Sequence, residues 1–322
     1  MSAFLTYRFP DKTKDRFFGS FELIENQAVK TGFIVTNLDL SATYLFHESQ
    51  NESSEIEFFQ SDDKPYIMTA REYYLQAHEL LNGLNVMQME KAVFSRVKSV
   101  SFDISQSEKL FDVLCESYPK AFVYLFTDPK LGTWIGASPE VLIESRRDFV
   151  FTTALAGTRK NEEETWGEKE KHEQEIVTDY ILAVCNNLNL KGIQTVGPYD
   201  FQAGPITHIK TDISAELNGV SPWGLAQNIH PSPAIGGFPK EQAIGLIHSV
   251  EPHQRGIYTG IIGKISEENA KLYVNLRCAQ LFDKQAYLYL GGGYTMQSIP
   301  EMEWIETENK SKTLVECIQK IV

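Results

Sequence analysis

The chain has 322 residues and a formal net charge of −13, with 42% hydrophobic and 23% charged residues. This is the composition of an ordinary globular protein, since no low-complexity tract indicates disorder. An acidic surface repels a phosphate backbone, and no dense stripe of lysine and arginine reverses this locally, so we expect no nucleic-acid partner. A protein of this charge that binds an anionic small molecule must gather positive charge in a pocket, from a metal ion, lysine or arginine.

Several features of the sequence predict a cytoplasmic protein without membrane association. The first residues lack the continuous apolar core of a signal peptide, and no stretch approaches the about 18 apolar residues of a membrane span. The four cysteines form no C-x-x-C pair and are expected to be free thiols in a reducing compartment: Cys115, Cys185, Cys278 and Cys317. The histidines form no H-E-x-x-H motif, so carboxylates must hold any bound metal.

The predicted elements begin with an irregular N-terminal part that ends near residue 65. It contains two short strand-like runs, at residues 32–38 and 42–46, and a polar acidic segment at 49–63 that we expect to be a surface loop. A helix over residues 69–86 follows, ended by Gly83 and Asn85.

Strands and helices then follow one another to the C-terminus. The predicted strands cover residues 91–102, 121–128, 133–138, 140–145, 149–157, 271–283 and 286–295. The predicted helices cover residues 107–118, a long segment from about Glu162 to Leu188, and the C-terminal segment from about Glu301. Because the strands come in consecutive groups, the pattern favours an α+β fold of mostly antiparallel sheets flanked by helices over a doubly wound nucleotide-binding fold. No linker separates two halves, so we predict a single domain over residues 1–322.

The long helix carries a carboxylate on its apolar face. At about 100° per residue, one stripe contains Ile176, Val177, Tyr180, Ile181 and Val184. Glu173 falls near the middle of this stripe, whereas Glu175 falls on the opposite face. A buried carboxylate is costly unless it is paired or binds a metal. The alternative is an exposed Glu173 in a frayed first turn, favoured there by the helix dipole, and the helix alone leaves both interpretations open.

The last predicted helix contains a second acidic cluster. Glu303, Glu306 and Lys310 are neighbours at positions i, i+3 and i+7 of the segment PEMEWIETENK. Two carboxylates at this spacing repel one another unless a cation lies between them. The alternative is a solvated helix face with a weak Glu306–Lys310 pair.

Cations and glycines occur where strands are expected to be buried. Lys91 begins a strand on which Val93, Ser95 and Val97 share its face, so it would be partly desolvated and usable as a general base. The alternative is a lysine that reaches solvent at a strand end. Arg277 falls within a predicted strand, where its guanidinium needs a carboxylate partner. Glycines at Gly157 and at Gly291–Gly293 end two strands and would let backbone amides approach a ligand closely.

Nine motifs occur in order along the chain: KAVFSR, GASPEVLIE, ALAGTRK, KHEQEIVTDYI, HPSPAIGGFPKEQA, EPHQRGIYTGIIG, NLRCAQL, GGGYT and PEMEWIETENK. Together they resemble the chorismate-binding family, which comprises isochorismate, salicylate, anthranilate and aminodeoxychorismate synthases. The resemblance runs from about Lys91 to the C-terminus, whereas residues 1–65 match poorly and look abbreviated, so that residues 66–322 form the expected catalytic core. The resemblance implies two mostly antiparallel sheets flanked by helices, with the site between them.

The resemblance also implies roles for individual residues. Glu173 corresponds to the metal-binding glutamate of the family's E-H-x-x-V helix, with Gln174 in place of the usual histidine. Glu306 corresponds to the second magnesium ligand, and Glu303 is expected to support it directly or through water. Lys91 corresponds to the general base and Glu140 to the general acid. The residues expected to bind substrate are Gly157, Thr158, His230, Arg277, Gly292, Gly293 and Lys310.

Two positions distinguish the reactions of the family. Enzymes that add ammonia carry glutamine where this chain has Lys91, whereas a lysine resembles the enzymes that add water, because water needs a base. Aminodeoxychorismate synthases also have a nucleophilic lysine where this chain has Ala156. We therefore expect no ammonia chemistry and no glutaminase subunit.

The resemblance therefore implies a magnesium-dependent isochorismate synthase that acts on chorismate. Ala234 and Ile235 occupy the segment in which salicylate synthases usually have threonine. One alternative is nevertheless a salicylate synthase, which continues to pyruvate elimination. Another is a non-catalytic chorismate-binding subunit, which the presence of the expected catalytic residues argues against. The sequence does not distinguish menaquinone from siderophore biosynthesis, or a monomer from a weak homo-oligomer.

Overall fold

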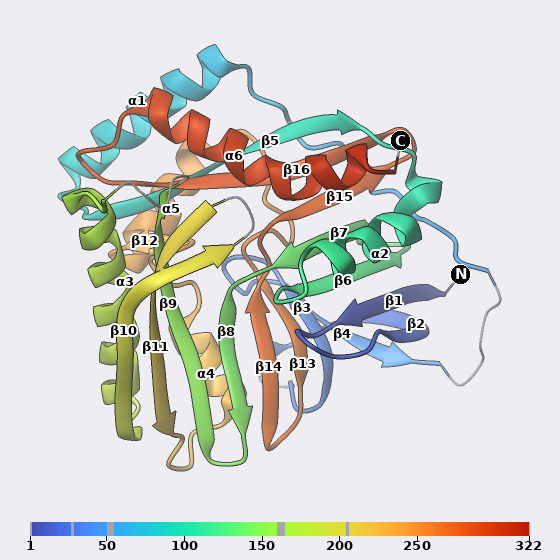
Figure 1. Ribbon diagram of the computed structural model, residues 1–322, viewed down its shortest axis with the longest axis horizontal. Helices are drawn as coiled ribbons and strands as arrows, with labels where there is room; N and C mark the ends of the chain where they lie inside the picture. The colour runs from blue at the N-terminus through green and yellow to red at the C-terminus, as the bar shows by residue number, and fades with distance from the viewer. Residues whose placement is uncertain (1, 27–28, 50–54, 160–164, 204–205, 322) are drawn as a thin grey trace.

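The computed structural model describes residues 2–26, 29–49, 55–159, 165–203 and 206–321 (Figure 1). Within these residues, hydrogen bonds join sixteen strands into one antiparallel sheet. The strands are β1 (Ala3–Arg8), β2 (Asp15–Ile24), β3 (Gly32–Thr36), β4 (Thr43–Glu48), β5 (Lys91–Ser101), β6 (Phe122–Asp128), β7 (Gly132–Ser138), β8 (Val141–Arg146), β9 (Phe149–Arg159), β10 (Lys191–Ala203), β11 (Ile206–Glu216), β12 (Gly237–Phe238), β13 (Ile261–Ile265), β14 (Asn269–Val274), β15 (Cys278–Phe282) and β16 (Gln285–Tyr294).

The strand order is β10-β11-β9-β8-β14-β13-β3-β4-β2-β1-β6-β7-β15-β16-β5-β12. The predicted α+β class with mostly antiparallel strands is confirmed. Where the resemblance implied two sheets, the hydrogen bonding is continuous. The N-terminal strands β1–β4 lie between β13 and β6, so the segment that resembles the family least connects the two halves of the sheet.

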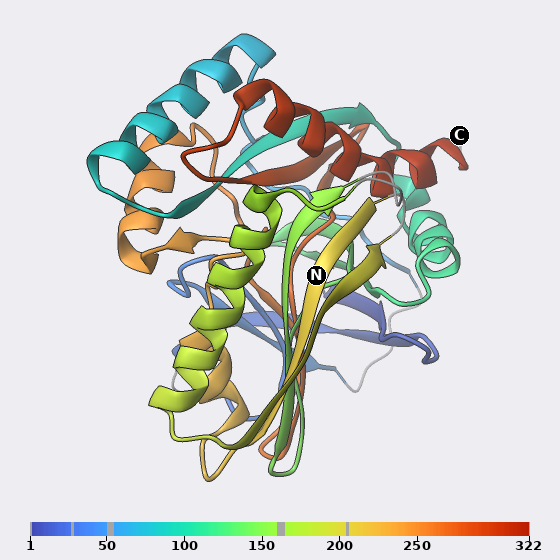
Figure 2. The same ribbon diagram turned by 60° about the vertical axis from the view of Figure 1, so that its left-hand side comes forward.

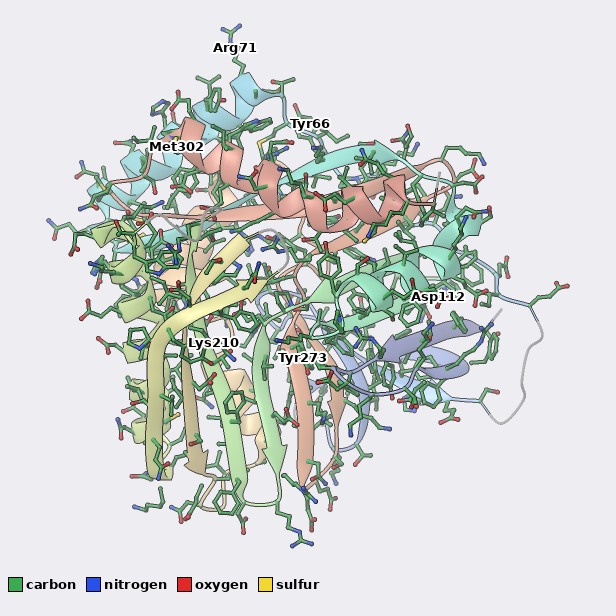
Figure 3. The ribbon with its side chains drawn as sticks, in the orientation of Figure 1. Tyr66, Arg71, Asp112, Lys210, Tyr273 and Met302 are labelled. Carbon is green, nitrogen blue, oxygen red and sulfur yellow. The ribbon has the colours of Figure 1, made fainter. Side chains whose placement is uncertain are left out.

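Aromatic side chains fill the space where the sheet bends back on itself. Tyr273 on β14, labelled in Figure 3, stacks on Phe122 of β6 with ring centroids 4.8 Å apart, although these strands are distant in the strand order. Phe122 also contacts Phe33 of β3, and Phe33 stacks on Tyr7 of β1. Such contacts bury large apolar areas and favour offset or tilted ring pairs. This cluster therefore holds the two halves of the sheet face to face.

Helices cover the outer faces of both halves (Figures 1 and 2). They are α1 (Ala70–Val86), α2 (Ser107–Ser117, after a 3₁₀ turn at Ile104–Gln106), α3 (Glu168–Asn187), α4 (Pro222–Ile229), α5 (Lys240–Val250) and α6 (Pro300–Gln319). α3 packs on β9 and β11, α6 on β16, and α5 on β5 and α1. Within the described part of the chain, no helix is both long enough and apolar enough to cross a membrane.

The helix predicted over residues 69–86 corresponds to α1 (Ala70–Val86), in which Gly83 leaves room for Leu246 of α5. Two predicted boundaries differ from the structure. The start predicted for the long helix, Glu162, lies outside the described residues, and α3 begins at Glu168. The strand predicted over residues 271–283 is interrupted, because the chain leaves β14, which pairs with β8 and β13, and enters β15, which pairs with β7 and β16.

The aromatic cluster predicts a large effect of a single truncation. Phe122 is fully buried, whereas Phe149, at the start of β9, is 65% exposed. Phe122→Ala should lower the free energy of unfolding by about 3–5 kcal/mol through lost burial and a residual cavity. Phe149→Ala should change it by less than about 0.5 kcal/mol. Chemical denaturation of both variants measures this, and equal effects would mean that the cluster does not hold the two halves together.

Candidate active site

A cavity of about 80 Å³ lies among β5, β9, β11, β16, α3 and α6. Most of the predicted site residues line it: Lys91, Glu140, Gly157, Thr158, Glu173, Arg277, Gly292, Gly293, Glu306 and Lys310. A larger groove of about 850 Å³ is lined by none of these predicted residues. The smaller cavity is therefore the candidate active site.

Lys91 and Glu173 meet on one wall of this cavity. Lys91 is the first residue of β5 and is only 2% exposed, which agrees with an inward position and not with a solvated strand end. Its Nζ lies 3.6 Å from Oε2 of Glu173 on α3. A Cβ atom at Gly293 of β16 would lie 2.8 Å from Cε of Lys91 and 3.3 Å from Oε2 of Glu173. Glycine at this position therefore leaves the space in which the two side chains meet.

Glu173 is buried on the apolar face of α3, as the periodicity of the helix suggested. α6 presents two further carboxylates on its inner face. Glu303 is 2% exposed, whereas the preceding Met302, on the outer face of α6, is 60% exposed (Figure 3). A Cβ atom at Gly292 would lie 3.3 Å from Oε2 of Glu303, so the glycines of β16 also make room for α6.

Two lysines lie among these carboxylates. Nζ of Lys169 lies 2.5 Å from Glu303 and 3.5 Å from Glu173, and Nζ of Lys310 lies 2.6 Å from Glu306. Burial, then the charge of Glu306, raises the pKa of Glu303 to about 7, although Lys169 opposes this. Burial alone would raise the pKa of Glu306, but the charge and hydrogen bond of Lys310 outweigh it and hold that pKa below its ordinary value. Lys169 of α3 and Lys310 of α6 therefore supply the positive charge that the closely spaced carboxylates of α6 require.

The carboxylate cluster fits magnesium. Mg²⁺ prefers oxygen ligands and is usually held by one or two carboxylates together with groups of its substrate. Among the described residues, no three His, Cys, Asp or Glu side chains form a ready coordination shell. Oε2 of Glu303 is buried and accepts no hydrogen bond of normal geometry from a described residue. It therefore keeps an oxygen atom available for a cation.

Glu140 faces the same cavity from the segment between β7 and β8. Burial raises the pKa of Glu140 to about 7, although the positive charges of Lys91, Lys310 and Arg277 oppose this. A carboxyl group with a pKa near neutrality can hold a proton and donate it, as a general acid must.

One residue predicted to bind substrate does not line this cavity. His230 ends α4 and does not line the cavity; its ring is fully buried, and Nε2 lies 2.9 Å from the carbonyl oxygen of Leu38. The histidine of the cavity is His208 on β11. It faces an irregularity in the pairing of β9 with β11, where Gly157 has φ +65°. No motif marks His208 in the sequence, because its place follows from the pairing of two strands about fifty residues apart.

The hydrogen bonding of His208 defines its role. Nδ1 lies 2.8 Å from the carbonyl oxygen of Gly157, and a carbonyl accepts only, so Nδ1 carries the proton and Nε2 is an acceptor. Burial, then the charge of Arg277, lowers the pKa of His208 to about 3. His208 is therefore neutral at physiological pH, and its Nε2 can accept a hydrogen bond from a hydroxyl group of a ligand.

Arg277 lies between β14 and β15 and not within a strand, with φ +51°. Its Nη1 donates to the carbonyl oxygen of Lys310 at 3.2 Å and to Oγ1 of Thr313 at 3.3 Å. Arg277 therefore bonds to a carbonyl oxygen and a hydroxyl group of α6 in place of the predicted carboxylate. Lys310 donates to the carbonyl oxygen of Gly291 at 2.9 Å. Both cations line the cavity and are suited to hold a substrate carboxylate there. Tyr258 and Thr259, which the sequence analysis did not single out, complete part of the wall.

The raised pKa of Glu140 predicts a pH-dependent stability difference. A carboxyl group whose folded pKa is raised contributes least to stability above that pKa, so the free energy of unfolding should fall as pH rises from 4.5 to about 7. Glu140→Gln removes this loss and should be more stable than the native protein by about 3 kcal/mol at pH 8, with little difference at pH 4. Urea denaturation across this range measures the difference. Glu144→Gln, at a half-exposed position of β8, is the control, and a pH-independent difference at Glu140 would contradict the assignment.

Comparisons with known proteins identify the family of this chain. Residues 11–319 match the family described as chorismate binding enzyme. Isochorismate synthase MenF of Bacillus subtilis is 29% identical over 81% of this chain and 59% of its own length. Anthranilate synthase component 1 of Aquifex aeolicus is 29% identical over 66% of this chain and 46% of its own length. The chain thus spans three fifths or less of the length of these two relatives.

A solved structure shows the same fold. The menaquinone-specific isochorismate synthase MenF of Escherichia coli has a TM-score of 0.81 to this protein at 17% identity, covering 99% of this chain and 89% of that one. The family model matches residues 11–319, nearly the whole sequence, and the chain therefore belongs to the chorismate-binding enzyme family.

Proposed function

We propose that this protein is an isochorismate synthase that converts chorismate into isochorismate with magnesium. The observation that supports this most directly is that Lys91 and a carboxyl group with a pKa near neutrality, Glu140, face one cavity. A reaction that adds water at one ring carbon and expels hydroxide from another needs a base and an acid in this way. The resemblance to isochorismate synthases, in which a lysine stands where ammonia-adding relatives have glutamine, supports the same reaction.

The proposed substrate is a dianion, and the cavity offers cations and donors for its carboxylates. Arg277 and Lys310 would each hold a carboxylate group, and the main-chain amides beside Gly157 and Gly292 can donate to it. Nε2 of His208 would accept a hydrogen bond from a ring hydroxyl. These contacts orient the ring, which supplies much of the advantage of a bound over a free reactant.

Glu173 and Glu306 would hold Mg²⁺, with Glu303 as a third oxygen donor directly or through water. When bound, the ion would neutralise a substrate carboxylate and withdraw electron density from the ring. Lys169 and Lys310 balance the same carboxylates, so the cluster can accept a cation without burying uncompensated negative charge beforehand.

Side chains of the protein carry out the proton transfers. Lys91 accepts a proton from a water molecule as its oxygen bonds to C2 of the ring, and the ring double bonds shift. The C4–oxygen bond breaks while Glu140 donates a proton to the departing hydroxyl, which leaves as water. One water enters and one leaves, so the reaction is reversible and reaches an equilibrium mixture. No pyruvate is released in this reaction, whereas a salicylate synthase continues to pyruvate elimination.

The role of Lys91 is tested by Lys91→Ala. Loss of a general base should reduce turnover by a factor on the order of 10²–10⁴, while chorismate binding stays measurable by titration calorimetry because Arg277 and Lys310 remain. Chromatography of the products gives the readout. Lys98→Ala, on the same strand but paired with Glu308, is the control and should turn over normally. Full activity of Lys91→Ala would refute the base assignment, and salicylate with pyruvate from the native protein would refute the product.

The magnesium site is tested without turnover. A ligand at 100 times its Kd stabilises the folded state by about 2.7 kcal/mol, so the native protein should melt at a higher temperature in MgCl₂ than in EDTA. Glu306→Gln should lose most of this increase. Glu308→Gln is the control, since Glu308 lies two residues away and binds Arg96 and Lys98 instead. The same increase in Glu306→Gln as in the native protein would place the metal elsewhere.

A further inference from the structure

We propose that a buried ion pair, Glu251–Arg255, is a positioning device that aligns Lys91 and two further walls of the cavity. Glu251 follows the last residue of α5, and Arg255 lies four residues later; both side chains are nearly fully buried. Nε and Nη2 of Arg255 lie 2.9 and 2.6 Å from the two carboxylate oxygens of Glu251. This bidentate geometry fixes the plane of the guanidinium group.

The remaining donors of Arg255 reach three segments that line the cavity. Nη2 donates to the carbonyl oxygen of Val93 at 2.6 Å, and Nη1 donates to the carbonyl oxygen of Ile235 at 3.0 Å. Nη1 also lies 3.3 Å from Oγ1 of Thr259. Val93, Ile235 and Thr259 all line the cavity, yet they come from β5, the segment before β12 and the segment before β13. One guanidinium group therefore holds three separate walls in register.

Along β5, the ion pair makes backbone hydrogen bonds that a longer neighbouring strand would otherwise make. β12 is two residues long and pairs with Lys91 and Ala92. Beyond it, the amide of Val93 donates to Gly236, the carbonyl oxygen of Val93 accepts from Arg255, and the amide of Ser95 donates to Oε1 of Glu251 at 2.7 Å. Unpaired groups at a buried sheet edge are costly. The ion pair satisfies them and so fixes the backbone from which Lys91 projects.

Thr259 indicates how firmly this region is held. It is a fully buried β-branched residue with φ +63°, a region that such residues rarely adopt. Strain of this kind persists where surrounding contacts determine the conformation, and it occurs often at functional sites. The amide of Thr259 donates to the carbonyl oxygen of Asn275 at 2.8 Å, and its hydroxyl is the acceptor for Arg255. Neither Arg255 nor Glu251 lines the cavity, so both act on it through its walls.

The test compares two arginines that are both 6% exposed. Arg255→Lys keeps the positive charge but loses the planar guanidinium group that makes the bidentate contact. Arg8→Lys is the control, since Arg8 donates to the carbonyl oxygens of Tyr118, Pro119 and Ala121, none of which lines the cavity. Arg255→Lys should lower kcat by about tenfold or more with a smaller change in KM, because a displacement of about 1 Å is enough for such a loss. Arg8→Lys should leave kcat and KM unchanged while lowering the melting temperature.

Amide hydrogen exchange without substrate provides a second readout that does not depend on the proposed reaction. Peptides covering residues 91–95 and 232–237 should exchange faster in Arg255→Lys than in the native protein, and at the native rate in Arg8→Lys. Native exchange there, or an equal loss of kcat in both variants, would overturn the proposal. If the native protein shows no turnover of chorismate, the proposed function fails while the exchange result still decides the positioning role.

A second pair of variants covers the case in which Arg255→Lys does not fold. Thr259→Gly suits φ +63° but lacks the hydroxyl acceptor, so it should fold and still lower kcat and protection at residues 91–95. Thr259→Ser keeps the acceptor and should retain most of the native kcat. A Thr259→Gly variant with native kcat and native protection would contradict the proposal.

Discussion

The site depends on the burial of carboxylates between α3, α6 and β16. A buried carboxylate is tolerated only when cations or hydrogen bonds compensate it. Glu173 and Glu303 share Lys169, Glu173 also faces Lys91, and Glu306 is paired with Lys310. Two of these pairs lie within one helix, but Lys169–Glu303 joins α3 to α6 and Lys91–Glu173 joins β5 to α3, so the complete cluster requires both helices to pack on the sheet. The chemistry of the cavity is thus coupled to the tertiary structure.

α3 and α6 can approach β16 closely only where this strand carries no side chains on the facing side. Side chains at Gly292 and Gly293 would meet Glu303 and the Lys91–Glu173 pair, respectively. Glycines inside a strand normally weaken it, but here β5 pairs with β16 along its whole length, glycines included, while β15 pairs with its first residues, Gln285–Leu288. The loss of local strand preference is therefore offset by pairing, and the glycines serve close approach. The same trade is visible at Gly157, where a positive φ accompanies the irregular pairing opposite His208.

The aromatic cluster determines how the two halves of the sheet meet, and hence where strand ends from distant parts of the chain arrive. Phe122 and Tyr273 belong to strands on different halves and stack across the bend. The break at Arg277 lies where the chain crosses from one half to the other, and its positive φ is the local cost of that crossing. At this crossing point Arg277 contacts α6 and also lines the cavity.

Local sequence patterns determined much of this protein. Helical periodicity put Glu173 on the apolar face of its helix and Glu303 beside Glu306, and alternation put Lys91 on one face with Val93, Ser95 and Val97, because these patterns depend only on the geometry of a single element. Whether Glu173 and Lys91 are buried was decided by the tertiary structure. The grouping of strands predicted an antiparallel α+β fold. Tertiary structure alone decided that His208 and not His230 enters the cavity, that Arg277 lies between strands, and that Arg255 joins three walls. Each of these depends on pairing or packing between segments far apart in the chain, and no local pattern records which distant segments meet.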